Sequence, residues 1–175
     1  MNILVLNGSP RKNGNVSTAL KKEAERFSKK NEGCTITWED VSSLNFDFCK
    51  GCMACRSKEK CVLKDDDAHR IAEEIKNCDM IIAGTPVYWG NMNGKLKSLF
   101  DRLVGVMMGE SKSGIPKPLH KGKKAVIVTS CTTPFPFNYI CGQSTGAVNA
   151  LREILKTSGF KIIRKVNLSN TKNKK

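Results

Sequence analysis

A group of closely spaced cysteines has the clearest chemical meaning in this chain. They follow the pattern C-x2-C-x2-C-x5-C and comprise Cys49, Cys52, Cys55 and Cys61. Thiolates at these intervals can surround one metal centre, and ferredoxin-type iron-sulfur proteins use a similar C-x2-C-x2-C run. Structural zinc sites usually separate two C-x2-C pairs by a longer segment, so the compact pattern favours a [4Fe-4S] cluster. Zinc, a redox disulfide and unmetallated thiols are the alternatives.

A polar loop, NGSPRKNGNVS at residues 7–17, is the second chemical feature. It follows an apolar run and precedes a helical pattern, so backbone N–H groups and a positive helix end point at one place, which favours an anion. The spacing matches neither a Walker A loop nor a Gly-x-Gly-x-x-Gly motif, which disfavours ATP and dinucleotides. A single terminal monophosphate suits the polar side chains, which are Ser9, Arg11, Asn15 and Ser17. An ordinary strand-to-helix turn is the alternative.

A second loop, TPVYWGNMNG at residues 85–94, combines features that suit a flat aromatic ligand. Pro86 stiffens the turn, and Gly90 allows the backbone to approach a ring edge. The Tyr-Trp pair can cover the ligand, and the amide of Asn91 can both donate to and accept from a pyrimidine-like edge. The alternative is that the two aromatic side chains only cap the core.

A parallel sheet is expected to position these loops, because they interrupt an alternation of apolar strands and amphipathic helices. Strands are expected near residues 3–6, 34–39, 79–84, 124–130 and 160–166, and helices near 16–30, 65–75, 96–107 and 148–155. The alternation predicts an α/β fold, a flavodoxin-like three-layer sandwich with a five-stranded parallel sheet of order 2-1-3-4-5. In that order the ligand lies outside the carboxyl ends of the strands, where the polar loops fall.

Length and composition place this sheet in a single domain. The 175 residues predict one domain, 1–175, with a cysteine-rich loop at 45–64. No apolar run approaches the roughly 20 residues of a membrane span, and the start lacks a charged signal region, so we expect a cytoplasmic protein without a membrane partner. The net charge of +14 is spread along the chain without a reading motif, which favours a solvated surface over nucleic-acid binding.

Several smaller features complete the expectations. Residues 96–107 are expected to form one long helix, residues 109–124 a surface loop, and residues 169–175 a frayed tail. His69 and His120 are expected to be solvent-exposed, so neither is assigned a catalytic role. The thiols of Cys78, Cys131 and Cys141 are interpreted as structural, buried or incidental.

The three motifs together resemble the NADPH-dependent FMN reductase family, which has a flavodoxin-like fold, and within it the iron-sulfur flavoproteins. The motifs are LNGSPRKNGNVS, CKGCMACRSKEKC and TPVYWGNMNGKLKSLFDR, and the resemblance runs from Met1 to about Val166. It implies FMN as the prosthetic group. It places Ser9, Arg11, Asn15, Val16 and Ser17 around the phosphate, and Pro86, Val87, Tyr88, Trp89, Gly90, Asn91 and Ser130 around the isoalloxazine ring. Family members often have Thr where this chain has Val16, so only the backbone N–H of that residue can serve.

The expected function is that of an FMN-dependent oxidoreductase whose chemistry is centred on the flavin. Electrons would pass from NAD(P)H or ferredoxin to a small-molecule acceptor, through a [4Fe-4S] cluster. The alternatives are a cluster-free NAD(P)H:FMN or quinone reductase and a non-catalytic electron carrier. The resemblance also implies a homodimer or homotetramer, in which the loop 109–124 or the cysteine loop reaches a neighbouring flavin.

Overall fold

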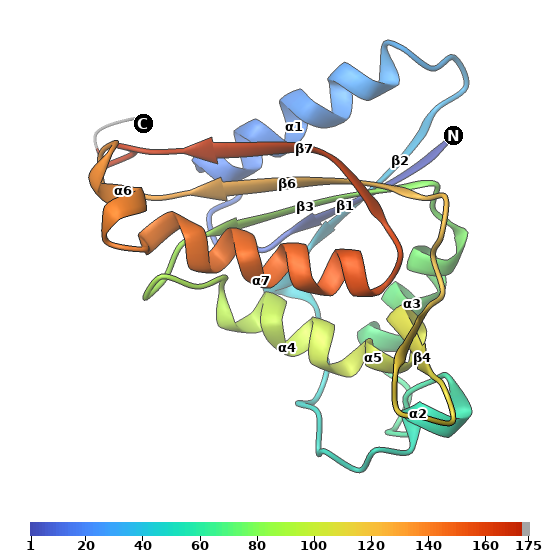
Figure 1. Ribbon diagram of the computed structural model, residues 1–175. Helices are drawn as coiled ribbons and strands as arrows, with labels where there is room; N and C mark the ends of the chain where they lie inside the picture. The colour runs from blue at the N-terminus through green and yellow to red at the C-terminus, as the bar shows by residue number, and fades with distance from the viewer. Residues whose placement is uncertain (173–175) are drawn as a thin grey trace.

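A five-stranded parallel sheet forms the centre of the computed structural model, which describes residues 1–172 (Figure 1). The strand order is β2-β1-β3-β6-β7. The strands are β1 (Asn2–Asn7), β2 (Thr35–Asp40), β3 (Met80–Pro86), β6 (Lys124–Ser130) and β7 (Lys161–Leu168). These are the five predicted strands in the predicted order 2-1-3-4-5, so the flavodoxin-like sandwich is confirmed.

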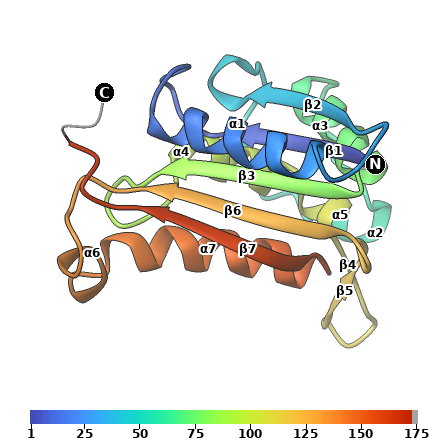
Figure 2. The same cartoon turned by 90° about the horizontal axis from the view of Figure 1, so that it is seen from above.

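Helices cover both faces of the sheet, as a parallel sheet requires. One face is covered by α1 (Asn15–Ser28), and the other by α3 (Asp67–Asn77), α4 (Gly94–Arg102), α5 (Val104–Met107) and α7 (Gln143–Thr157) (Figures 1 and 2). Within residues 1–172, none of the helices combines the length and the apolar character needed to span a bilayer.

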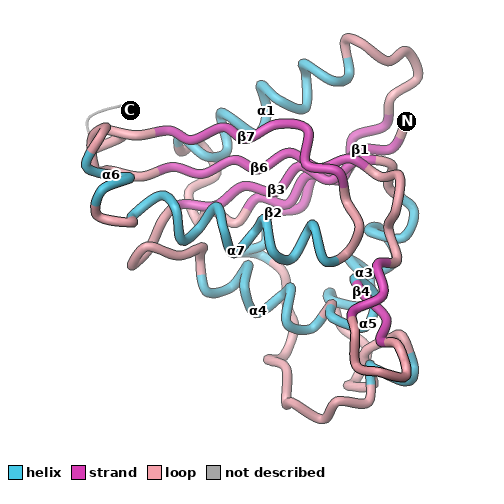
Figure 3. The backbone as a smooth tube through the Cα atoms, in the orientation of Figure 1, coloured by secondary structure: helices cyan, strands magenta, loops and turns pink. Residues whose placement is uncertain are grey.

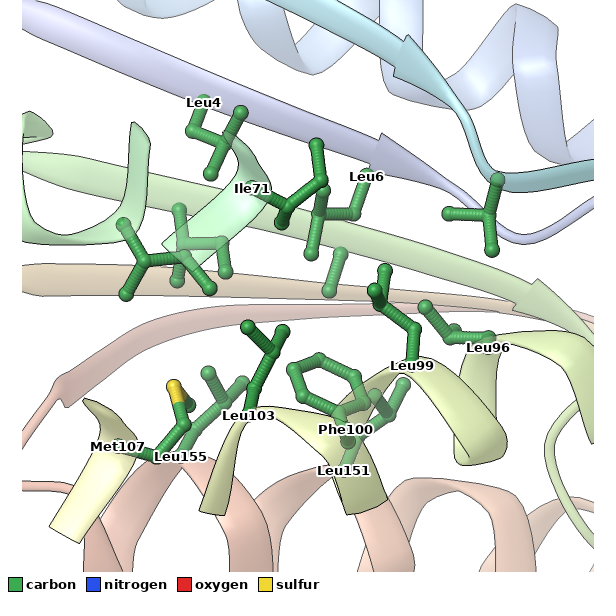
Figure 4. Packing of buried hydrophobic residues seen from close by; sticks show 14 of the residues in the cluster. Leu4, Leu6, Ile71, Leu96, Leu99, Phe100, Leu103, Met107, Leu151 and Leu155 are labelled. Atoms are coloured by element: carbon green, nitrogen blue, oxygen red, sulfur yellow. The ribbon is translucent and has the colours of Figure 1, made fainter. Parts of the chain in front are cut away.

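The core divides into two layers because successive side chains of a strand point to opposite faces. In β1, Ile3 and Val5 pack under α1, whereas Leu4 and Leu6 pack under the helices of the opposite face. Figure 4 shows the second layer, in which Phe100 and Leu151 approach from α4 and α7. Burial on both sides explains why these strands are continuous apolar runs in the sequence.

The segment between α3 and β6 differs from two predictions. The expected long helix is interrupted at Leu103, whose φ of −91° and ψ of 0° end α4 and begin α5. The expected surface loop 109–124 contains a hairpin of β4 (Met108–Glu110) and β5 (Pro116–Pro118), paired antiparallel. These strands are too short, and β5 too rich in proline, to show a strand pattern in the sequence.

The remaining short elements are η1 (Val41–Ser43), α2 (Cys55–Lys58) and α6 (Phe137–Ile140). Apart from α2, residues 44–64 lack regular structure, as Figure 3 shows. The segment that contains the four closely spaced cysteines is thus a long connection between η1 and α3.

Both histidine predictions are wrong. His120 is buried, donates from Nε2 to the carbonyl of Val106 at 2.9 Å, and lies against the ring of Phe160 with centroids 5.0 Å apart. His69 is partly buried and belongs to the capping box of α3 with Asp66. The contacts of His120 join residues that are distant in the sequence, so they depend on the fold, whereas the capping box of His69 is a local contact with a residue three positions earlier.

The other small predictions have mixed outcomes. Cys78 and Cys131 are buried as expected, whereas Cys141 is exposed. The tail was expected to fray from residue 169, but Thr171 is bonded to the carbonyl of Cys131 through its N–H at 3.3 Å and its hydroxyl at 2.9 Å. The last part of that predicted tail, 173–175, lies outside the described residues.

Candidate active site

A cleft of about 730 Å³ opens at the carboxyl ends of β1, β3 and β6. Its volume is in the range of natural small-molecule and cofactor sites. The residues from the sequence analysis that line it are Ser9, Arg11, Asn15, Val16, Pro86, Val87, Tyr88 and Ser130. Three segments far apart in the sequence thus meet at the edge where the sheet order predicted a ligand.

The first polar loop takes its shape from the buried amide of Asn7. Its Oδ1 accepts from the N–H of Ser9 at 3.1 Å, and its Nδ2 donates to Ser17 Oγ at 3.0 Å and to Asp40 Oδ1 at 2.8 Å. The N–H of Gly8 donates to the carbonyl of Gly84 at 2.8 Å, which ties the loop to β3. Asn7 was missed in the sequence because it has the appearance of the last residue of a strand.

The predicted phosphate residues divide into two groups. Ser9 and Arg11 line the cleft, and the N–H of Arg11 donates to Ser9 Oγ at 3.2 Å. Ser17 is fully buried and donates its hydroxyl to the carbonyl of Arg11 at 2.8 Å, so it supports the loop from below. Gly14 begins α1 without a side-chain cap, which leaves the positive helix end directed at the cleft.

The second loop is a tight turn that follows β3. The N–H of Val87 donates to the carbonyl of Ser130 at 2.8 Å, and Tyr88 and Asn91 exchange backbone hydrogen bonds of 2.9 Å. Between them, Trp89 and Gly90 adopt positive φ values of 51° and 72°. Trp89 is fully exposed, and within residues 1–172 the cleft lining includes Tyr88 but not Trp89, Gly90 or Asn91.

The chain end also contributes to the cleft, which the sequence did not indicate. Thr171 and Lys172 line it. Ser130 donates its hydroxyl to Thr171 Oγ1 at 3.2 Å, and Asn15 Nδ2 donates to the carbonyl of Thr171 at 3.5 Å. Two of the predicted cofactor residues therefore contact this segment.

The cysteine loop brings its thiols into one neighbourhood without gathering them. Cys49 and Cys52 are exposed, and Cys55 and Cys61 are partly buried. Burial raises the pKa of the Cys55 thiol, and the nearby thiols of the other three cysteines raise it further. Within residues 1–172, no three potential metal ligands are close enough together to hold an ion. The thiol set suits a thiophilic metal by its chemistry, but the loop is more open than a bound cluster requires.

The cysteine loop and the cleft lie at different places on the protein. Figures 1 and 2 show α2 beside α5 and β4, whereas α6 lies at the carboxyl edge of the sheet. The packing agrees, because a Cβ added at Gly105 of α5 would lie 2.7 Å from Cys55 Cβ. Each site is therefore built by its own elements.

Comparison with known proteins identifies the family. The sequence profile of the NADPH-dependent FMN reductases matches residues 1–173. The chain belongs to the NADPH-dependent FMN reductase family. The family resemblance carried by the three motifs is thereby confirmed for nearly the whole chain.

Within the FMN reductases, the relatives of this chain include iron-sulfur flavoproteins. It is 40% identical to the iron-sulfur flavoprotein of Methanosarcina thermophila over 108 residues, which cover 59% of this chain and 53% of that protein. It is 37% identical to an iron-sulfur flavoprotein of Clostridioides difficile (strain 630) over 105 residues, covering 58% of this chain and 45% of that protein. The chain thus spans about half the length of the relatives that it matches.

Comparison with a solved structure confirms the fold. The FMN-dependent NADH-azoreductase of Bacillus anthracis str. Ames Ancestor, in complex with FMN, superposes with a TM-score of 0.75. The superposition covers 97% of this chain and 87% of that one at 12% identity. At this identity the likeness concerns the fold alone.

Proposed function

We propose that this protein is an FMN-dependent oxidoreductase that binds FMN in the cleft at the carboxyl ends of β1, β3 and β6. The observation that carries the proposal is that the first polar loop, the second loop and the end of β6 meet in one cleft of about 730 Å³. Membership of the NADPH-dependent FMN reductase family and the FMN complex of the B. anthracis protein support it.

The roles of the phosphate-binding residues follow from the chemistry of the first loop. Arg11 supplies a guanidinium, Ser9 a hydroxyl, and Asn15 an amide, while Val16 contributes its backbone N–H at the start of α1. Ser17 acts indirectly through the carbonyl of Arg11. A monophosphate is thus held by one positive charge and several N–H and O–H donors.

The second loop and the end of β6 would hold the isoalloxazine ring. Pro86, Val87 and Tyr88 would provide the apolar wall, and Ser130 lines the cleft next to them, on the neighbouring strand. We propose Trp89, Gly90 and Asn91 as rim residues that contact the ring or the substrate above it. FMN supplies hydride and one-electron chemistry when bound, and the residues of this chain bind, orient and shield it.

We further propose that Cys49, Cys52, Cys55 and Cys61 hold a [4Fe-4S] cluster. The compact thiol pattern and the iron-sulfur flavoproteins among the relatives support this assignment. Lys50, Arg56, Lys58 and Lys60 would offset the negative charge of the ligands. Because the thiols are not gathered in the structure, binding requires the loop to contract around the cluster.

The donor, acceptor and assembly belong to the same proposal. NAD(P)H or ferredoxin would reduce the protein, and a small molecule would take up the electrons in the cytoplasm. The cluster loop lies away from the cleft of its own chain, so a homodimer or homotetramer would bring it to the flavin of a neighbour.

The decisive experiment is anaerobic reconstitution with FMN, iron and sulfide, followed by absorption spectroscopy and metal analysis. Flavin bands with a broad visible shoulder and about four irons per chain, the content of a cubane held by four thiolates, are expected. A chain that takes up no FMN under these conditions contradicts the oxidoreductase proposal.

A cluster-free NAD(P)H:quinone reductase is the second candidate, favoured by the separation of the thiols in the structure. It predicts flavin without iron and steady-state NADPH oxidation with a quinone. Reduction by ferredoxin alone, without quinone turnover, would instead indicate an electron carrier. Iron content and quinone turnover, measured on the same preparation, separate the three functions.

A further inference from the structure

A buried guanidinium lies beside the cysteine loop. Arg102, the last residue of α4, has a side chain with 0% exposure. A charge so completely removed from water must be paired and hydrogen-bonded, or it destabilises the fold. Its partners therefore indicate what the residue holds in place.

Asp66 provides the charge partner. Its carboxylate accepts from both terminal nitrogens of Arg102, at 2.8 and 3.1 Å. The same carboxylate accepts from the N–H of Ala68 at 3.0 Å and so caps α3. This bidentate pair joins the end of α4 to the beginning of α3.

The other hydrogen bonds of Arg102 go to the two ends of the cysteine loop. One terminal nitrogen donates to the carbonyl of Asp47 at 2.7 Å, just before the first cysteine. Nε donates to the sulfur of Cys61, the last cysteine, at 3.2 Å. One side chain thus connects the start and the end of the loop.

A second contact, independent of Arg102, holds the middle of the loop. A Cβ added at Gly105 would lie 2.7 Å from Cys55 Cβ and 2.8 Å from the Cys55 carbonyl oxygen. Only glycine allows α2 to pack this closely on α5. The interruption of the helix at Leu103 places Arg102 and Gly105 against different parts of the same loop.

We propose that the junction of α4 and α5 positions the cysteine loop: Arg102 joins its two ends and donates Nε–H to Cys61 Sγ, while Gly105 admits Cys55. Arg102 is a positioning residue, because it acts through the cysteines. The role in metal binding rests on the proposed function, whereas the positioning of the loop does not.

Limited trypsin digestion of the metal-free protein tests the positioning directly. In Arg102→Met, we expect cleavage within the loop, at Arg56, Lys58 and Lys60, to accelerate about tenfold or more relative to the original chain. The reason is that lost hydrogen bonds to a charged group shift a local opening equilibrium by that order. Cleavage in the turn after α1, at the exposed Lys29 and Lys30, is the internal reference and should keep its rate.

Arg70→Met is the matched control. Arg70 also binds carboxylates, those of Glu39 and Asp67, but its side chain is 46% exposed and it has no hydrogen bond to the cysteine loop. Its loop cleavage should equal that of the original chain. Equal ratios of loop cleavage to cleavage at Lys29 and Lys30 in Arg102→Met and Arg70→Met would overturn the proposal.

Two further variants keep the test decisive if Arg102→Met does not fold. Arg102→Lys keeps the charge but loses the fork that reaches Asp66, Asp47 and Cys61 together. Gly105→Ala keeps Arg102 and displaces Cys55. Each should raise the ratio of loop cleavage to cleavage at Lys29 and Lys30, and an unchanged ratio in both would contradict the proposal.

The midpoint potential of the iron-loaded protein tests the bond to Cys61 separately, because a residue that only stabilises the fold would leave this potential unchanged. A hydrogen bond to a ligating sulfur stabilises the reduced cluster, so Arg102→Lys should lower the midpoint potential relative to Arg70→Lys. An unchanged potential would contradict the role of the Nε–H bond. If neither the original chain nor any variant binds iron, the cluster proposal fails. The trypsin digestion then still tests whether Arg102 positions the cysteine loop.

Discussion

At the scale of single residues, Arg11 separates phosphate recognition from ring recognition. It lines the cleft beside the uncapped start of α1. In Arg11→Met we expect FMN to bind about tenfold more weakly, because one charge-assisted contact is lost, while riboflavin, which has no phosphate, binds as before. Fluorescence titration with both flavins measures the difference. Arg26→Met, at the far end of α1, is the control.

The buried amide of Asn7 supports the first polar loop from within, although Asn7 does not line the cleft. Replacement by Ala leaves the N–H of Ser9 and the hydroxyl of Ser17 without their buried partner. We expect a loss of about 1–3 kcal/mol in the free energy of unfolding and weaker FMN binding. Urea denaturation measures the loss, with Asn31→Ala as control, because Asn31 lies in the turn after α1 and, among the described residues, its side-chain amide donates only to the carbonyl of Phe27. Equal stability of the two variants would contradict the role of Asn7.

His120 gives the fold a dependence on pH. Burial lowers its pKa below the ordinary 6.5, against the effect of its bond to Val106 and with a smaller contribution from Lys123. The imidazole therefore binds a proton more readily in the unfolded chain than in the folded one. Through this group, the free energy of unfolding is highest above pH 6.5 and decreases as the pH falls below that value. His120→Gln, which does not titrate, should show a flatter profile of unfolding free energy against pH. An identical slope in both proteins would exclude His120 as the source.

At the scale of elements, the junction of β1, β3 and α4 has no room for a side chain at Gly8. An added Cβ would lie 2.8 Å from the Gly84 carbonyl oxygen and 2.9 Å from Leu96 Cδ2. Gly8→Ala should lower the free energy of unfolding by about 1–3 kcal/mol through overpacking and should weaken FMN binding. Gly94→Ala is the control, because nothing lies within 4 Å of its added Cβ and alanine favours the helix. Calorimetry of both variants checks the contrast.

The elements that the sequence predicted well are those with a strong apolar period. The strands of the main sheet are buried on both faces and stand out as continuous runs such as AVIV. The break at Leu103 and the β4–β5 hairpin were missed because the apolar spacing continues through the first, and the second is formed by two segments of three residues. Their conformations depend on packing against the cysteine loop.

At the scale of the whole molecule, exposed aromatic side chains lie on the second loop and on α6. Trp89 is 102% exposed and Phe137 is 57% exposed. Exposed apolar surface of this kind marks interaction sites. One chain has a mass of 19.3 kDa, and we expect light scattering to give two or four times this mass. Trp89→Ala should shift the protein toward the monomer, whereas Ile163→Ser on the edge strand β7 should not.

The sequence by itself indicated the strands, the helices and the residues with chemical potential, because these depend on local periodicity and spacing, and the strand order followed from the flavodoxin-like arrangement that they fit. The tertiary structure alone decided which of them meet. It placed Asn7 under the first polar loop and Thr171 at the cleft, left Trp89 on the surface, and joined Arg102 to both ends of the cysteine loop. Such contacts connect residues up to 156 positions apart in the chain, and no local pattern reports which distant partner a polar side chain will find once the sheet has assembled.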